Sequence, residues 1–209
     1  MRSFRRSRFL TLMLSMECGL AAADSVSADL AKLPIEADIV ALVEIVSGEL
    51  VFDAQGMACG ASYRVRVERA LKGTIDGELV TFGRYGGYGI GKSYFAFLKT
   101  KSRRAPPPLQ YTFSSPYSVR PECLAVTPPL EAMSEGLGLI AVEPGNLVKY
   151  RPAVSLSSGP YLIPEAIKAT RKPGGQVHDG YFYGSVQVEI GDFYDFIHSK
   201  LSEEKKEID

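Results

Sequence analysis

The sequence predicts a mostly β fold that ends in one amphipathic helix. Three observations predict it. Four segments in the first half are rich in β-branched and aromatic residues, which suit a pleated sheet. Ten of the 13 prolines fall between residues 106 and 160, where they exclude long helices. Near the C-terminus, alternating apolar residues give way to apolar residues spaced as on one face of a helix.

The first half of the chain predicts four strands. Residues 37–48, ADIVALVEIVSG, are apolar at both alternating sets of positions, so this strand should be central and buried on both faces. Residues 62–73, SYRVRVERALKG, alternate apolar with charged residues and predict a half-buried strand. Residues 77–85, GELVTFGRY, and 93–100, SYFAFLKT, supply two more.

The proline-rich stretch from about residue 100 to 160 predicts an irregular insertion with short edge strands. Three short apolar runs are candidates for those strands: LQYTF at 109–113, LGLIAVE at 137–143 and NLVKY at 146–150. Residues 129–136, PLEAMSEG, predict a short helix, with proline in its first turn and glycine at its end.

Regular structure returns near the C-terminus. Residues 183–191, YGSVQVEIG, alternate and predict a half-buried strand. Asp192 then resembles a helix N-cap. A helix over about 192–206 would place four apolar side chains on one face: Phe193, Phe196, Ile197 and Leu201.

Residues 1–23 have the layout of a secretory signal peptide. Four arginines precede the apolar run Phe9–Met16, and Ala21–Ala23 provides a cleavage site before Asp24. The apolar run is shorter than the roughly 20 residues that span a bilayer. An organelle transit peptide is the alternative. We therefore expect a periplasmic or secreted single domain over 24–209, without a transmembrane segment.

The charge balance bears on nucleic-acid binding, and the cysteine content agrees with export. The chain has 24 basic and 24 acidic residues, and without residues 1–23 it has 20 and 23, a net charge of −3. This balance predicts no nucleic-acid binding. Cys18 lies in the signal, so Cys59 and Cys123 remain. In an oxidising compartment an even pair predicts one disulfide, and two buried free thiols are the alternative.

The segment GGYGIGKS, residues 86–93, matches the phosphate-binding pattern G-x-x-x-x-G-K-S. A true phosphate loop needs a helix directly after it, with the helix N-terminus aimed at the phosphates. Here the following residues are aromatic and predict a strand. We therefore expect extended backbone after Ser93 and an accidental match.

No catalytic constellation is evident elsewhere. His178 and Asp179 form the only other candidate, an acid/base or metal pair, but HDG is also a common turn sequence. The alternative function is thus a hydrolase, using either the site at 86–93 or His178 with Asp179. We expect no cofactor and no metal.

Two motifs resemble those of exported bacterial proteins with a netrin-like, OB-type β-barrel, a fold shared with tissue inhibitors of metalloproteinases. One is the strand ending V-E-x-x-L-K-G, here Val67–Gly73, and the other is G-x-x-Y-x-x-F-L, here Gly91–Leu98. The resemblance covers residues 37 to about 123 and implies a netrin-like barrel. Those inhibitors chelate the protease zinc through an N-terminal cysteine, and this chain has none near Asp24.

The leading expectation for function is a non-catalytic exported module that binds an unidentified protein or envelope component through the barrel loops. The glycine-rich connection supplies the candidate binding residues Arg84, Tyr85, Tyr88 and Lys92, since aromatic and cationic side chains are common at binding hot spots. Alternatively, the tyrosines fold back to cover the end of the barrel. A purely structural envelope component is the third possibility.

Overall fold

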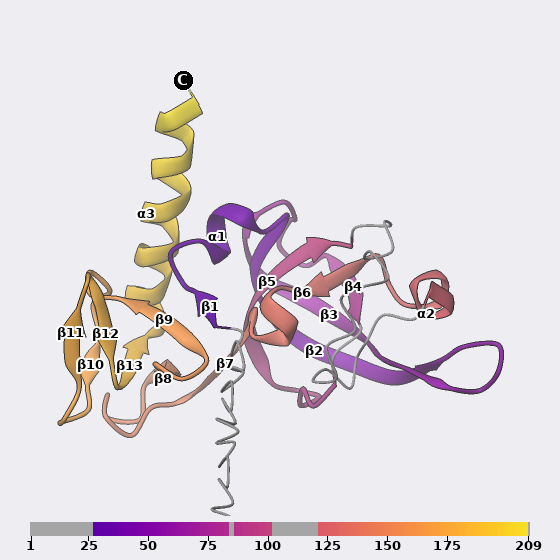
Figure 1. Ribbon diagram of the computed structural model, residues 1–209, viewed down its shortest axis with the longest axis horizontal. Coiled ribbons are helices and arrows are strands. Elements are labelled where there is room, and N and C mark those ends of the chain that lie inside the picture. Colours follow the sequence, from indigo (N-terminus) through magenta and orange to yellow (C-terminus); the bar gives the residue numbers. More distant parts are fainter. Residues whose placement is uncertain (1–26, 84–85, 102–120, 209) are drawn as a thin grey trace, which may run out of the picture.

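The computed structural model describes residues 27–83, 86–101 and 121–208, and it is mostly β with a long C-terminal helix (Figure 1). The signal-like residues 1–23 and the candidate strand 109–113 lie outside this range. The strands are β1 (Ala28–Asp29), β2 (Ile39–Phe52), β3 (Ala58–Lys72), β4 (Leu79–Gly83), β5 (Ser93–Thr100), β6 (Leu130–Ala132), β7 (Leu139–Pro144), β8 (Pro152–Ser157), β9 (Tyr161–Pro164), β10 (Thr170–Arg171), β11 (Gln176–His178), β12 (Tyr181–Tyr183) and β13 (Ser185–Glu189). The helices are α1 (Leu33–Glu36), α2 (Pro121–Val126) and α3 (Ile190–Ile208), with a 3₁₀ turn η1 (Ser134–Gly136).

Five strands close a ring of hydrogen-bonded neighbours. β2 pairs antiparallel with β3 and β5, and β3 pairs antiparallel with β4. The short strand β6 closes the ring, because it pairs in parallel with β4 and antiparallel with β5.

The sheet continues from β5 beyond the ring. β7, β8, β13 and β10 follow in that order, each antiparallel to its neighbour. A smaller sheet of β1, β9, β12 and β11 lies beside this extension, at the left of Figure 1.

Two apolar cores meet at β2 and β5. One core is lined by the ring strands and takes Ala41, Val43 and Ile45 from β2. The other lies under α1 and α3 and takes Val40 from the same strand. Successive side chains of a strand point to opposite faces, so a strand between two cores must be apolar at both sets of positions. The expectation of a central strand buried on both faces is confirmed for Ile39–Ile45.

The strand predicted at 93–100 is confirmed with the same bounds. The predictions at 62–73, 77–85 and 183–191 correspond to β3, β4 and β13. The run at 137–143 corresponds to β7, which lies inside the sheet between β5 and β8.

The helix predicted at 129–136 is wrong. Leu130–Ala132 form strand β6, and only Ser134–Gly136 make a helical turn, of the 3₁₀ kind. Unpaired backbone edges of β4 and β5 are available at this point, and a short helix would leave them open. Tertiary pairing therefore overrides the local pattern.

The strand predicted at 146–150 is also wrong. These residues form the tight connection between β7 and β8, in which Lys149 and Tyr150 have φ of +54° and +59°. The Tyr150 N–H donates to the Gly145 carbonyl at 2.8 Å, which closes the turn. Within the described residues the stretch after 120 is largely regular, with β6, β7 and β8 in place of an irregular insertion.

The C-terminal helix is confirmed, but it begins at Ile190 and not at Asp192. Asp192 therefore lies inside the first turn and is not the N-cap. Its Oδ1 accepts a hydrogen bond from Lys168 Nζ at 2.5 Å. Phe193, Phe196 and Ile197 are buried in the core under the helix, and Leu201 packs against it.

The end of the V-E-x-x-L-K-G motif has a structural role at the exit of β3. Lys72 Nζ donates to the Ile35 carbonyl at 2.7 Å and lies 3.4 Å from Glu204 Oε2, so it joins α1 to α3. Gly73 has φ of +71°, and a Cβ there would lie 2.0 Å from the Asp38 carbonyl oxygen. Only glycine fits this position.

Replacing Gly73 by alanine should therefore destabilise the fold by about 3 kcal/mol, from left-handed strain plus a forced shift of the backbone at Asp38. Gly77 is the matched control, because its φ is +82° but nothing lies within 4 Å of the place that a Cβ would occupy. Gly77→Ala should cost only about 1–2 kcal/mol. Urea unfolding of both variants checks this, and equal losses would contradict the close approach.

Candidate functional site

The end of the β2–β3 hairpin extends beyond the ring, at the right of Figure 1. β2 pairs with β5 only from Ile39 to Glu44, whereas it pairs with β3 as far as Phe52. β4 pairs with β3 only at Ser62–Arg66. Residues 50–61 therefore form a two-stranded ribbon. We call this ribbon, together with residues 46–49 of β2, the hairpin end (residues 46–61).

A buried aspartate shapes the turn of the hairpin end. Asp53 Oδ1 accepts hydrogen bonds from the N–H groups of Gln55 at 3.0 Å and Met57 at 2.8 Å. The Asp53 N–H donates to the Met57 carbonyl at 2.9 Å. A carboxylate that takes two backbone donors fixes a turn much as an N-cap fixes a helix start.

A disulfide anchors the hairpin end to α2. Cys59 and Cys123 are bonded, with their Cα atoms 5.2 Å apart, so the predicted disulfide is present in the structure. Both cysteines are buried. The end of α2 is joined to the end of β5 through Thr127, whose Oγ1 donates to the Cys123 carbonyl at 2.7 Å and accepts a hydrogen bond from Lys101 Nζ at 2.8 Å. The ribbon is thus tied to α2 beside its turn, because Cys59 lies next to the Phe52–Ala58 pair.

Three large apolar side chains of the hairpin end face solvent. Leu50 is 66% exposed, Phe52 50% and Met57 58%. Leu50 stands opposite Ala61 in the β2–β3 ladder, and Ala61 is buried. Opposite residues lie on the same face of an antiparallel pair, so Leu50 continues the apolar face of the ring core into solvent. Sites of this kind commonly mark binding surfaces.

The glycine-rich connection between β4 and β5 is organised around Tyr88. Its ring centroid lies 5.2 Å from that of Tyr63 and 5.8 Å from that of Tyr94. Its hydroxyl donates to the Gly136 carbonyl at 3.0 Å. Tyr88 thus packs over the end of the ring core, and Lys92 is exposed. The other two candidate binding residues, Arg84 and Tyr85, lie outside the described residues.

The backbone at 86–93 is not arranged to hold a phosphate. The N–H of Gly91 donates to the Ile45 carbonyl at 2.8 Å, and the N–H of Gly89 donates to the Tyr94 hydroxyl at 2.9 Å. The chain after Lys92 is strand β5, so the expected extended backbone is confirmed and no helix N-terminus follows the glycines.

His178 and Asp179 lie in the turn of the β11–β12 hairpin. His178 pairs with Tyr181, so Asp179 and Gly180 form a two-residue loop, with φ of +49° and +78°. Positive φ at both positions is typical of Asp-Gly hairpin turns. His178 Nδ1 lies 3.0 Å from Asp179 Oδ2, but both side chains are more than two-thirds exposed, and no pocket surrounds them among the described clefts.

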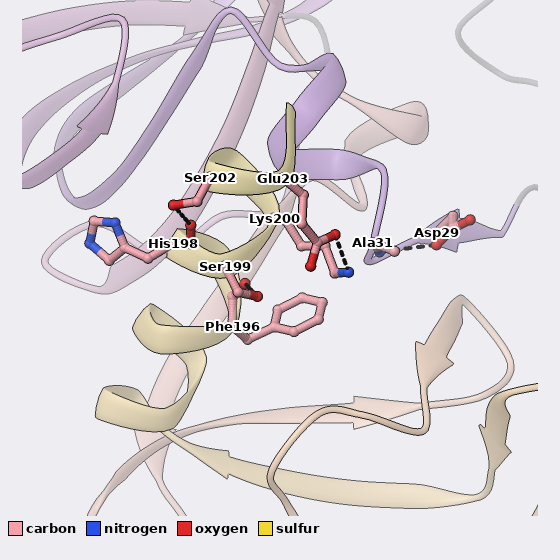
Figure 2. Close-up of polar contacts among 8 residues, drawn as sticks. All are labelled: Asp29, Ala31, Phe196, His198, Ser199, Lys200, Ser202 and Glu203. Carbon is pink, nitrogen blue, oxygen red and sulfur yellow. Dashed lines mark hydrogen bonds and ion pairs between the residues drawn. The ribbon is translucent and has the colours of Figure 1, made fainter. Parts of the chain in front are cut away.

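His198, the second histidine, lies on α3 and is exposed. Figure 2 shows its ring pointing away from the other labelled side chains. Its carbonyl accepts a hydrogen bond from Ser202 Oγ at 2.8 Å, a contact within the helix. The structure therefore places the two histidines on separate elements, α3 and β11.

An open polar cleft of about 470 Å³ lies at the start of α3, lined in part by Arg151, Lys168 and Gln187. Its cations are already paired. Arg151 Nη1 is 2.8 Å from Glu189 Oε2, and Lys168 Nζ is 2.5 Å from Asp192 Oδ1. The hydrogen bond to Asp192 raises the pKa of Lys168. This pairing leaves the cleft without a free cation for an anionic ligand among its described lining residues.

Comparison with known proteins identified no relative. The sequence matches no family model and no curated protein, and the fold matches no solved structure. Among the described helices, none has the length and apolar character needed to cross a bilayer.

The hairpin end was not among the binding residues predicted from sequence. One signal was present: the run LVF followed by Asp and Gly, Leu50–Gly56, places apolar residues beside a turn. Their exposure depends on β5 and β4 ending earlier than β2 and β3, and no local pattern specifies that difference.

Replacing both Cys59 and Cys123 by serine should lower the free energy of unfolding by about 4 kcal/mol, because the disulfide closes a loop with a sequence separation of 64. Thiol titration in denaturant provides an independent check. The full chain should show one thiol, Cys18, and a chain without residues 1–23 should show none. Three titratable thiols in the unreduced full chain would contradict the disulfide.

Proposed function

We propose that this protein is an exported, non-catalytic module that binds a protein or envelope component through the hairpin end, on an OB-type scaffold. The signal-like residues 1–23 and the disulfide support export, because disulfides persist in oxidising compartments.

The order of the ring strands supports the OB-type part of the proposal. The ring runs β2–β3–β4–β6–β5 and back to β2, with one parallel pair, β4 with β6. A five-stranded Greek-key barrel of the OB type has this connectivity. In such barrels the loop between the first two strands and the loop between the last two flank the ligand-binding face. Here those loops are the hairpin turn and the segment that contains α2.

The observation that favours binding is the exposure of Leu50, Phe52 and Met57 on a ribbon that a disulfide holds beside its turn. Exposing large apolar side chains to water costs roughly 25 cal/mol per Å² relative to burying them. A surface that is already rigid loses little conformational entropy when a partner covers it. The fixed turn at Asp53 and the disulfide provide that rigidity.

A capture experiment tests the proposal. The chain from Asp24 onward is incubated with a native envelope extract, cross-linked and recovered. Leu50→Ser with Phe52→Ser should reduce the recovered component about tenfold or more, because hot-spot truncations cost about 2 kcal/mol each. The matched control is Ile75→Ser with Tyr150→Ser, since these side chains are 71% and 76% exposed but lie outside both the hairpin end and the glycine-rich connection.

Two outcomes would contradict the proposed surface. Equal loss in the control pair would indicate nonspecific apolar capture. Loss on Lys92→Ala, with the hairpin variant unaffected, would assign binding to the glycine-rich connection instead. A circular dichroism spectrum of each variant shows whether the fold is retained.

A further inference from the structure

We propose that the partner is an extended polypeptide segment that adds as a strand to the free edge of β2 at residues 46–52, with a basic side chain opposite Glu49. This inference rests on the proposed function and specifies the chemistry of its partner. It follows from the strand pairing, the exposure and the charge of the hairpin end.

The first step is that β2 changes from a central to an edge strand along its length. From Ile39 to Glu44 it lies between β3 and β5. Ile45 makes the last contact on the β5 side, where its N–H donates to the Lys92 carbonyl at 3.0 Å. From Val46 to Phe52, β3 is its only strand partner among the described residues. No other described strand therefore pairs with the edge of β2 over residues 46–52, on the side where β5 lies next to Ile39–Glu44.

The second step is that this edge is accessible. Every residue from Val46 to Leu50 is exposed, and so is Phe52. An edge strand presents N–H and C=O groups at a regular spacing along its length. Seven residues span about 23 Å, at roughly 3.3 Å per residue. Only another extended backbone matches such a row of donors and acceptors, and peptide recognition by strand addition uses it.

The third step is the charge of the hairpin end. Residues 46–61, VSGELVFDAQGMACGA, contain two carboxylates and no basic residue. Asp53 is buried in the turn, so Glu49 is the exposed charge. It stands opposite the neutral Ser62 in the ladder with β3, and it has no ion pair among the described residues. Glu49 at the free edge of β2 therefore favours lysine or arginine on the added strand.

The same charge disfavours a second copy of this chain. If two β2 edges paired antiparallel about residues 46–52, the central residue Glu49 would face its own copy. Like charges directly opposite in a sheet are destabilising. An anionic membrane surface is disfavoured as well, because the hairpin end lacks the lysines and arginines that bind it. A foreign basic segment is the occupant that fits.

Leu50 and Phe52 specify the apolar positions of the added strand. They are two residues apart on β2 and hence on one face, whereas Glu49 lies on the other. An added strand of alternating apolar and basic residues places its apolar side chains beside Leu50 and Phe52. Its basic side chains then lie beside Glu49. The backbone edge of β2 supplies the hydrogen bonds to the added strand. The face with Leu50 and Phe52 and the face with Glu49 select alternating apolar and basic residues in it.

The probe is a capped heptapeptide of alternating valine and lysine, with a valine–glutamate peptide as the matched control. Binding is measured by titration of ¹⁵N-labelled chain from Asp24 onward. We expect the lysine peptide to bind saturably and to protect amides within 46–52 from hydrogen exchange. The glutamate peptide should bind more weakly. Glu49→Lys should reverse the preference, by up to about fivefold for one cross-strand pair.

Two N-methylated versions of the lysine peptide separate strand addition from simple charge attraction. One carries methyl groups on its odd amides and the other on its even amides, so each blocks one edge of the peptide. One version should lose about tenfold or more in affinity, because it removes two or three backbone hydrogen bonds. The other should bind nearly as the parent does.

The inference is overturned if the lysine peptide does not bind, or if neither methylated version weakens binding. It is also overturned if the protein alone dimerises in sedimentation experiments with the same amides protected, since a second copy would then occupy the edge. These results leave the capture experiment with Leu50→Ser and Phe52→Ser unaffected. If the Leu50→Ser and Phe52→Ser variant loses the captured component but the lysine peptide does not bind, the hairpin end remains the binding surface. The proposal that its partner is an extended strand is then rejected.

Discussion

The antiparallel pairing of β2 with β5 separates two apolar cores, and the other elements are arranged around this pair. Val40 of β2 and Phe95 and Phe97 of β5 belong to the core under α3. Val43 of β2 and Tyr94 of β5 belong to the core inside the ring. Each strand is therefore apolar on both faces over the paired length. Burying both faces joins the ring to the C-terminal half, because β2 and β5 contribute side chains to both cores.

The same pairing also sets where the hairpin end begins. β5 begins at Ser93, and the chain before it turns at Gly91, whose N–H donates to the Ile45 carbonyl. β2 therefore has no pairing with β5 beyond this point, although it is still paired with β3. Beyond that point the side chains of β2 are exposed. One strand thus serves as core scaffold in its first half and as candidate binding edge in its second. The disulfide from Cys59 to α2 holds the far end of that second half, beside the turn.

Several residues in the recognisable motifs have structural roles. Gly91, which completes the phosphate-loop pattern, has φ of +74° and starts the turn into β5. Lys72 and Gly73, at the end of V-E-x-x-L-K-G, hold α1 and allow the close approach of Asp38. Motifs of this kind specify how strands begin and end. Function has to be argued from sites, and here the exposed site lies outside both motifs.

The sequence alone determined the strands of the first half and the C-terminal helix, because each depends on local periodicity. It also predicted the pairing of Cys59 with Cys123, because these are the two cysteines outside the signal-like residues 1–23, and left two free thiols as the alternative. Only the tertiary structure decided that residues 130–132 are a strand and 146–150 a turn. Both depend on partners far away in the chain: the open edges of β4 and β5, and the β7–β8 pairing. The candidate site at the hairpin end also depends on partners far away in the chain. Leu50 and Phe52 have the alternation of a buried strand, and they are exposed because the neighbouring strands end before them.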